Sequence, residues 1–73
     1  MNYNDFINYV NFMYHNNNTI GMRYGQMIMN YLSEVWPDKH RELISTYDDC
    51  FYDDKTVSRT LSRLEREWVV QNG

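Results

Sequence analysis

The feature that most constrains this chain is the recurrence of apolar side chains at the 3.6-residue period of an α-helix. The repeat is clearest near the end of the sequence, at Val57, Leu61, Leu64 and Trp68. These positions share one face of a helix, and either Asp53 or Asp54 can cap its first turn. The segment therefore predicts an amphipathic helix that packs its apolar face against a core.

The first half of the chain contains two more segments with helical spacing. The earlier one has apolar residues at Phe6, Ile7, Tyr9, Val10, Met13 and Tyr14, and the later one has them at Tyr24, Met27, Ile28, Tyr31, Leu32 and Val35. Asn4 or Asp5 can cap the earlier helix, which we expect to end near His15 because the asparagines that follow favour turns. Thr19 can cap the later helix.

Pro37 marks the start of a third, shorter helix. Proline disfavours helix at the preceding residue, Trp36, and suits the first turn of a new helix. Residues 45–54 have no helical repeat, and aspartates alternate there with aromatic residues. The sequence therefore predicts an all-α fold, a small compact bundle of about four short helices with an ordered acidic and aromatic loop before the last helix.

The length of 73 residues limits the chain to a single helical domain, 1–73, with a thin core. The lone cysteine, Cys50, suits a reducing compartment, and the sequence shows neither a membrane-length apolar run nor a signal-peptide pattern. We therefore expect a cytoplasmic protein without membrane contact. Aromatic residues make up 16% of the chain, more than so small a body can bury. A protein partner or a second copy of the chain, as in a homo-oligomer, is expected to cover some of them.

The acidic loop is the first candidate site. Four aspartates lie there, but their spacing lacks the pattern and the final glutamate of a calcium loop, so we expect no metal and no cofactor. Helix capping and solvation account for the acids, whereas the aromatic residues between them are typical of interfaces. The sequence thus predicts a partner-binding surface made of Tyr47, Asp48, Asp49, Phe51, Tyr52 and Asp53.

Catalytic patterns are absent from the sequence. His15, His40 and Cys50 lie on separate segments, and nothing arranges a nucleophile beside a base. Glycine-rich phosphate loops, zinc spacings and hydrolase motifs do not occur. We therefore expect no catalytic residues and a protein that is not an enzyme.

An arginine stripe on the last helix is the second candidate site. Arg59, Arg63 and Arg66 share one face and can contact phosphates, which would make the protein a nucleic-acid-binding regulator. Glu67 follows Arg63 by four residues and partly neutralises the stripe. The net charge of −3 at pH 7 also argues against nucleic acid as the main partner. Nucleic-acid binding is therefore kept as the alternative function.

Several segments together resemble a family of small uncharacterised proteins found in bacteriophages and bacteria. They are Arg23-Tyr24-Gly25-Gln26, Asn30-Tyr31-Leu32, Pro37, Asp49-Cys50-Phe51-Tyr52-Asp53-Asp54 and the stretch from Leu61 to Trp68. The family pattern is R-x-G-Q-x-x-x-N-x-L followed by D-P-F-Y-D-D, and Cys50 stands here in the place of its proline. The resemblance spans about residues 5 to 68 and implies a shared fold.

The matching segments also suggest a structural clamp and a function. Arg23 and Gln26, at the start of the second helix, can hydrogen-bond the acidic loop, with Arg23 pairing Asp49, Asp53 or Asp54. By analogy with small phage products that bind host proteins, the expected function is a non-enzymatic interaction protein that binds, and inhibits, a host protein. Its expected location is then the host cytoplasm.

Overall fold

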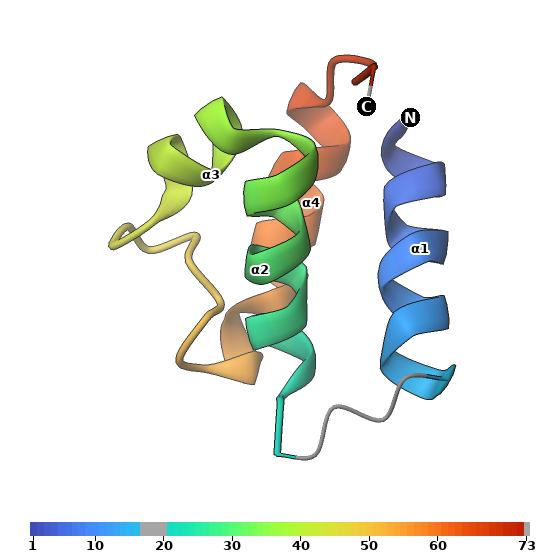
Figure 1. Cartoon of the computed structure of the whole chain (residues 1–73). Coiled ribbons are helices and arrows are strands. Elements are labelled where there is room, and N and C mark those ends of the chain that lie inside the picture. Colours follow the sequence, from blue (N-terminus) through green and yellow to red (C-terminus); the bar gives the residue numbers. More distant parts are fainter. Residues whose placement is uncertain (17–20, 73) are drawn as a thin grey trace.

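The computed structural model describes residues 1–16 and 21–72, which form helices joined by turns and loops (Figure 1). The α-helices are α1 (Tyr3–Asn16), α2 (Tyr24–Val35), α3 (Pro37–Leu43) and α4 (Val57–Glu67), and the 3-10 turn η1 (Asp54–Thr56) leads into α4. No strand occurs in the residues described. The predicted all-α bundle with four short helices is confirmed.

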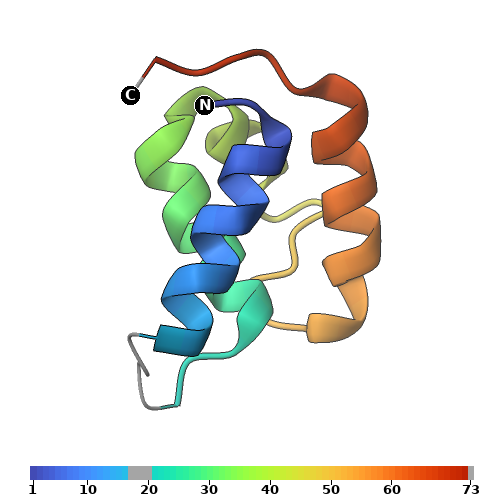
Figure 2. The same cartoon turned by 90° about the vertical axis from the view of Figure 1, so that its right-hand side faces the viewer.

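Three helices, α1, α2 and α4, form the body of the bundle, and the short α3 continues from the end of α2 (Figures 1 and 2). Helices α2 and α4 run in the same direction, and α1 runs in the opposite one. The fully buried apolar side chains are Phe6, Val10, Met27, Ile28, Met29, Leu32, Leu43, Cys50 and Leu64. Because α2 contributes more of them than any other element, it is the centre of the core.

Helix α1 begins earlier than the sequence predicted. Its cap is Asn2, whose side-chain oxygen accepts a hydrogen bond from the backbone N–H of Asp5 at 2.8 Å. The Asp5 carboxylate in turn accepts from the backbone N–H of Asn2 at 3.2 Å. These two reciprocal hydrogen bonds satisfy two backbone N–H groups at the start of the helix, as in a capping box. The predicted cap at Asn4 or Asp5 is therefore wrong by two or three residues, whereas the end of the helix at Asn16 is one residue from the expected place.

The other helix boundaries follow the sequence more closely. Helix α2 ends at Val35 and α3 starts at Pro37, as the proline predicted. Thr19, the expected cap of α2, lies outside the described residues. Asp53 caps η1, the turn that leads into α4, and its carboxylate accepts from the backbone N–H of Lys55 at 2.9 Å.

Both termini lie at one end of the bundle (Figure 2), and Trp68 packs beside Met1 there. Its ring centroid lies 5.1 Å from that of Phe6 and 5.2 Å from that of Trp36, and its Nε1–H donates to the backbone oxygen of Met1 at 3.0 Å. Helices α1, α2 and α4 meet at this ring. The last predicted apolar position of α4 therefore packs inward even though it stands just beyond the helix.

Candidate functional site

The loop between α3 and η1, residues 44–53, is held by its own hydrogen bonds. The carboxylate of Asp49 accepts from the backbone N–H of Ser45 and from that of Phe51, both at 2.9 Å. The hydroxyl of Thr46 donates to the backbone oxygen of Leu43 at 2.6 Å, which ties the loop to the end of α3. An ordered loop before the last helix was predicted, and Asp49 is the residue that orders its two flanks.

Arg23 and Asp54 attach this loop to the start of α2. One guanidinium nitrogen of Arg23 donates to the backbone oxygen of Phe51 at 2.5 Å, and another lies 3.7 Å from Asp54. The Asp54 carboxylate also accepts from the backbone N–H of Gly25 at 3.0 Å. It thereby places negative charge at the positive end of the α2 dipole. The aspartate that pairs with Arg23 is thus Asp54.

Gly25 is the point of closest approach between α2 and the loop. A Cβ atom there would lie 2.3 Å from the backbone oxygen of Cys50 and 2.8 Å from the Asp54 carboxylate. The Cys50 thiol donates to the Gly25 oxygen at 3.4 Å, and burial raises the pKa of this thiol. Gln26 forms no hydrogen bond with the loop in the described part of the chain, so the clamp consists of Arg23 and the backbone of Gly25 instead.

An ion-pair network joins the loop to α3 and α4. The guanidinium of Arg63 lies 2.7 Å from Asp48, 2.7 Å from Glu42 and 3.2 Å from Glu67. Lys39 is only 8% exposed and lies 2.8 Å from Glu42 and 2.9 Å from Glu67. Hydrogen bonds from Lys39 and Arg63 lower the pKa of Glu67 to about 2. Asp48, predicted as part of a partner-binding surface, is engaged here in holding α4.

The ion-pair network makes the arginine stripe less available for contact with phosphate groups. Arg63 is its central member, and three carboxylates surround it. Arg59 and Arg66 are mostly exposed, and they lie 4.0 Å from Asp48 and 3.5 Å from Glu67, respectively. Every arginine of the stripe therefore has a carboxylate nearby, so a phosphate group would have to compete with the protein's own acids.

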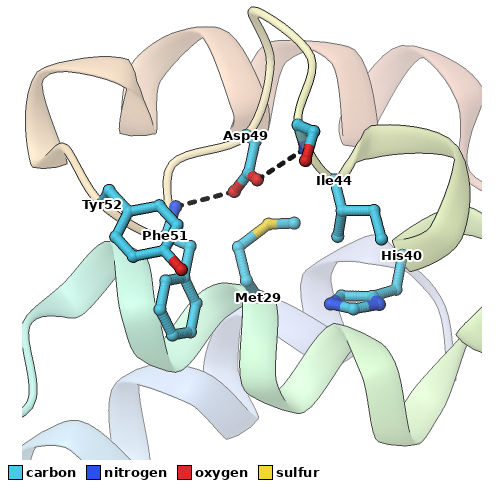
Figure 3. Close-up of a pocket in the computed structure, with 7 residues that line it drawn as sticks. Met29, His40, Ile44, Asp49, Phe51 and Tyr52 are labelled. Atoms are coloured by element: carbon cyan, nitrogen blue, oxygen red, sulfur yellow. Dashed lines mark hydrogen bonds between the residues drawn. The ribbon is translucent and has the colours of Figure 1, made fainter.

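A hollow of about 260 Å³ opens where α2, α3 and the loop meet (Figure 3). It is lined by Met29, His40, Ile44, Ser45, Asp49, Phe51 and Tyr52. Figure 3 shows the rings of Phe51 and Tyr52 on one side and Ile44 on the other, with Met29 between them. The two rings are in edge contact, with centroids 4.7 Å apart. The hollow thus has apolar walls, and the Asp49 carboxylate lies at its upper edge in this view.

The rim of this hollow is exposed and its floor is not. Tyr52 is 83% exposed and Ile44 is 42% exposed, whereas Met29 is fully buried. Exposed apolar side chains also occur elsewhere, for example at Phe12 and Tyr47, but Ile44 and Tyr52 border the hollow. The rim therefore offers apolar surface that another molecule can cover.

The predicted partner-binding residues divide into two groups. Asp49, Phe51 and Tyr52 lie together in the hollow, whereas Asp48 faces Arg63 in the network and Asp53 caps η1. Tyr47 is 87% exposed and does not line the hollow.

Four lining residues, Met29, His40, Ile44 and Ser45, were not among the predicted site residues. Met29 lies on α2 and His40 on α3, and Ile44 and Ser45 begin the loop. Nothing in the sequence placed the two helices beside the loop.

Comparison with models of protein families gives no match to this chain, and comparisons with curated proteins and with solved structures give no significant match either. Within the described residues, no helix has the length and apolar character needed to cross a membrane. The same residues contain no group of three or more histidine, cysteine, aspartate or glutamate side chains placed to hold a metal ion.

Proposed function

We propose that this protein is a non-enzymatic interaction protein of phage type, which binds and inhibits a host protein in the host cytoplasm. The binding surface is the hollow with its exposed rim of Ile44 and Tyr52, together with the acidic loop above it. The observation that carries this proposal is the hollow itself, an apolar depression lined by two aromatic rings and a carboxylate. Aromatic side chains in apolar depressions are the groups that supply most binding energy at protein interfaces.

The order of the loop supports binding at this place. Asp49, Arg23 and Asp54 fix the backbone on which Phe51 and Tyr52 stand. A surface that is already ordered loses little conformational entropy when a partner arrives. The phage origin is supported by the resemblance of the clamp and loop segments to the phage and bacterial family.

The alternative, a nucleic-acid-binding regulator, has less support. Its central residue, Arg63, is held by three carboxylates, and the net charge of the chain is −3. Binding to duplex DNA at low salt, lost when Arg59 and Arg66 are both replaced by methionine, would favour this alternative over the proposal.

The proposal is tested by affinity capture from a bacterial lysate with matched variants. The wild-type protein is compared with Ile44→Ser and Tyr52→Ala, which change the rim, and with Phe12→Ala as a control. Phe12 is a 61% exposed aromatic residue on α1, outside the hollow. We expect a bacterial protein to be retained by the wild type and by the Phe12 variant, and to be lost from both rim variants. Equal capture by all four proteins would contradict the proposal.

A second copy of the chain can also cover the rim. Light scattering on the purified protein measures this self-association. A dimer that dissociates in the Tyr52→Ala variant would place the homo-oligomer contact at the hollow, in competition with the host protein.

A further inference from the structure

The charge of the hollow indicates what kind of side chain it can hold. Among the described residues, the lining contains one carboxylate, that of Asp49, and neither a lysine nor an arginine. Two backbone N–H groups, of Ser45 and Phe51, fix this carboxylate at 2.9 Å each. A carboxylate has about four acceptor positions, so it can accept further hydrogen bonds from a cation.

The walls of the hollow suit a cation that is carried on an aliphatic stem. Phe51 and Tyr52 present aromatic rings, and Tyr52 is 83% exposed, so its ring is open to a cation from outside. Ile44, 42% exposed, supplies apolar surface on which methylene groups can pack, above the buried Met29.

The size of the hollow limits its occupant as well. At about 260 Å³ it is smaller than the pockets of roughly 300–1,000 Å³ that hold drug-sized ligands. It therefore matches one long side chain better than a cofactor or a metabolite.

We propose that this hollow is a subsite for a single arginine side chain of the partner protein. The guanidinium group stacks on the Tyr52 ring and donates to the Asp49 carboxylate, while its methylene stem lies over Ile44. Arginine fits better than lysine because its planar cation both stacks on rings and donates two parallel hydrogen bonds to a carboxylate. This inference rests on the proposed function, and it specifies the chemistry of the partner at that surface.

The test uses the isotope-labelled full chain and two small probes, N-acetyl-arginine amide and N-acetyl-citrulline amide. Citrulline has nearly the shape of arginine without the charge. We expect the arginine probe to shift the amide NMR signals of Ser45 and Phe51, the two N–H donors to Asp49, with a dissociation constant of the order of 1 mM. The citrulline probe is expected to leave both signals in place. Equal shifts with both probes, or no shift with arginine, would overturn the proposal.

Two variants of exposed tyrosines make the test specific to the hollow. Tyr52→Leu keeps apolar bulk but removes the ring face, and we expect it to weaken arginine binding about fivefold or more, since a cation–ring contact contributes on the order of 1 kcal/mol. Tyr47→Leu changes an equally exposed ring outside the hollow and is expected to bind like the wild type. Asp49→Asn serves as a third variant, and its amide spectrum shows first whether the loop is still folded. If Tyr52→Leu bound arginine as tightly as the wild type, the subsite would not exist.

The outcomes separate this inference from the proposed function. A host protein that is lost from the rim variants, combined with no arginine-specific shift, would overturn the subsite and leave the binding function standing. An arginine-specific shift without any captured protein would support the subsite and count against the host target.

Discussion

The two neighbouring aspartates of the loop, Asp48 and Asp49, serve two different regions of the molecule. Asp48 enters the ion-pair network with Arg63 and joins the loop to α4. Asp49 turns its oxygens to the backbone of its own loop and lines the hollow against α2 and α3. In the network region, the charges pair with one another within the chain. In the hollow region, two aromatic rings and a carboxylate line a depression that another molecule can occupy.

In this small domain, one part of the loop stabilises the fold and another part forms the hollow. A 73-residue domain gains limited stability from burial alone, so polar contacts at the edge of the core contribute a larger share. The network region has that role, because Lys39 is nearly buried there between two glutamates. In the hollow region, Tyr52 is 83% exposed and contributes little to the core, so its ring is available for contact with another molecule.

The largest effect is expected where both regions depend on the same contact, at Gly25. In Gly25→Ala the new Cβ would lie 2.3 Å from the backbone oxygen of Cys50, so the loop has to move away from α2. Overpacking of this kind costs typically 1–3 kcal/mol, and we expect a loss of about 2 kcal/mol in the free energy of unfolding, measured by urea denaturation. Both the network and the hollow should be disturbed, which amide NMR shifts would report.

Gly21→Ala is the matched control for this variant. Gly21 has φ +82°, and a Cβ there would meet no atom within 4 Å, so only the left-handed backbone is strained. We expect a smaller loss, about 1 kcal/mol. A Gly25→Ala protein as stable as the wild type would mean that the loop does not depend on its close contact with α2.

The second prediction separates the two regions. Arg63→Met keeps much of the aliphatic stem but leaves Asp48 without its nearest cation and removes one of the cations that pair with Glu42 and Glu67. For a pair that is neither fully buried nor fully exposed, we expect a loss of about 1–2 kcal/mol in urea denaturation. The signals of Phe51 and Tyr52 should change little, because those residues lie in the hollow.

Arg66→Met controls for the loss of a positive charge on the same helix. Arg66 is 68% exposed and lies 3.5 Å from Glu67, so we expect a change within about 0.5 kcal/mol. If both variants lost the same stability, the effect would come from net charge and not from the network.

The two regions also show which parts of the structure the sequence could predict and which it could not. The helical period and Pro37 predicted the helices and most of their limits, because both act through near neighbours in the chain. Asp48 and Asp49, by contrast, are adjacent in a segment without a period, so the sequence offered no way to tell which would face α4. Either Asp53 or Asp54 was expected to cap the last helix. Asp53 caps η1 before that helix, whereas the Asp54 carboxylate accepts from the backbone N–H of Gly25, 29 residues earlier. Such contacts depend on how the helices pack.

The candidate site could be predicted only in part for the same reason. The loop was predicted to be a binding surface from its aromatic residues, and it contributes Asp49, Phe51 and Tyr52 to the hollow. Met29 comes from α2 and His40 from α3, and only the packing of these helices brings them beside the loop. A hollow formed by three segments leaves no local pattern in any one of them.

The smallest effect is expected from protonation of a single group in the network, Glu67. Hydrogen bonds from Lys39 and Arg63 hold the pKa of Glu67 at about 2, below its ordinary value of 4.5. A carboxyl group whose pKa is lowered by folding stabilises the fold above its ordinary pKa, and this contribution is lost as the pH falls through the folded value. The urea midpoint should therefore fall as the pH is lowered from about 4.5 to about 2. Glu42 acts in the same direction, because Lys39 lowers its pKa too.

The Glu67→Gln variant tests whether this acid sensitivity belongs to the network. It lacks the titrating carboxyl group, so its urea midpoint should start lower at neutral pH and fall less steeply over the same range, while Glu42 still contributes. The hollow offers the contrast, because Tyr52→Leu removes no carboxyl group and should follow the wild-type curve. An identical fall in the wild type and in Glu67→Gln would mean that the acid-sensitive contacts lie elsewhere. The ion pairs of Glu67 would then not be the contacts that make the stability of the fold depend on pH.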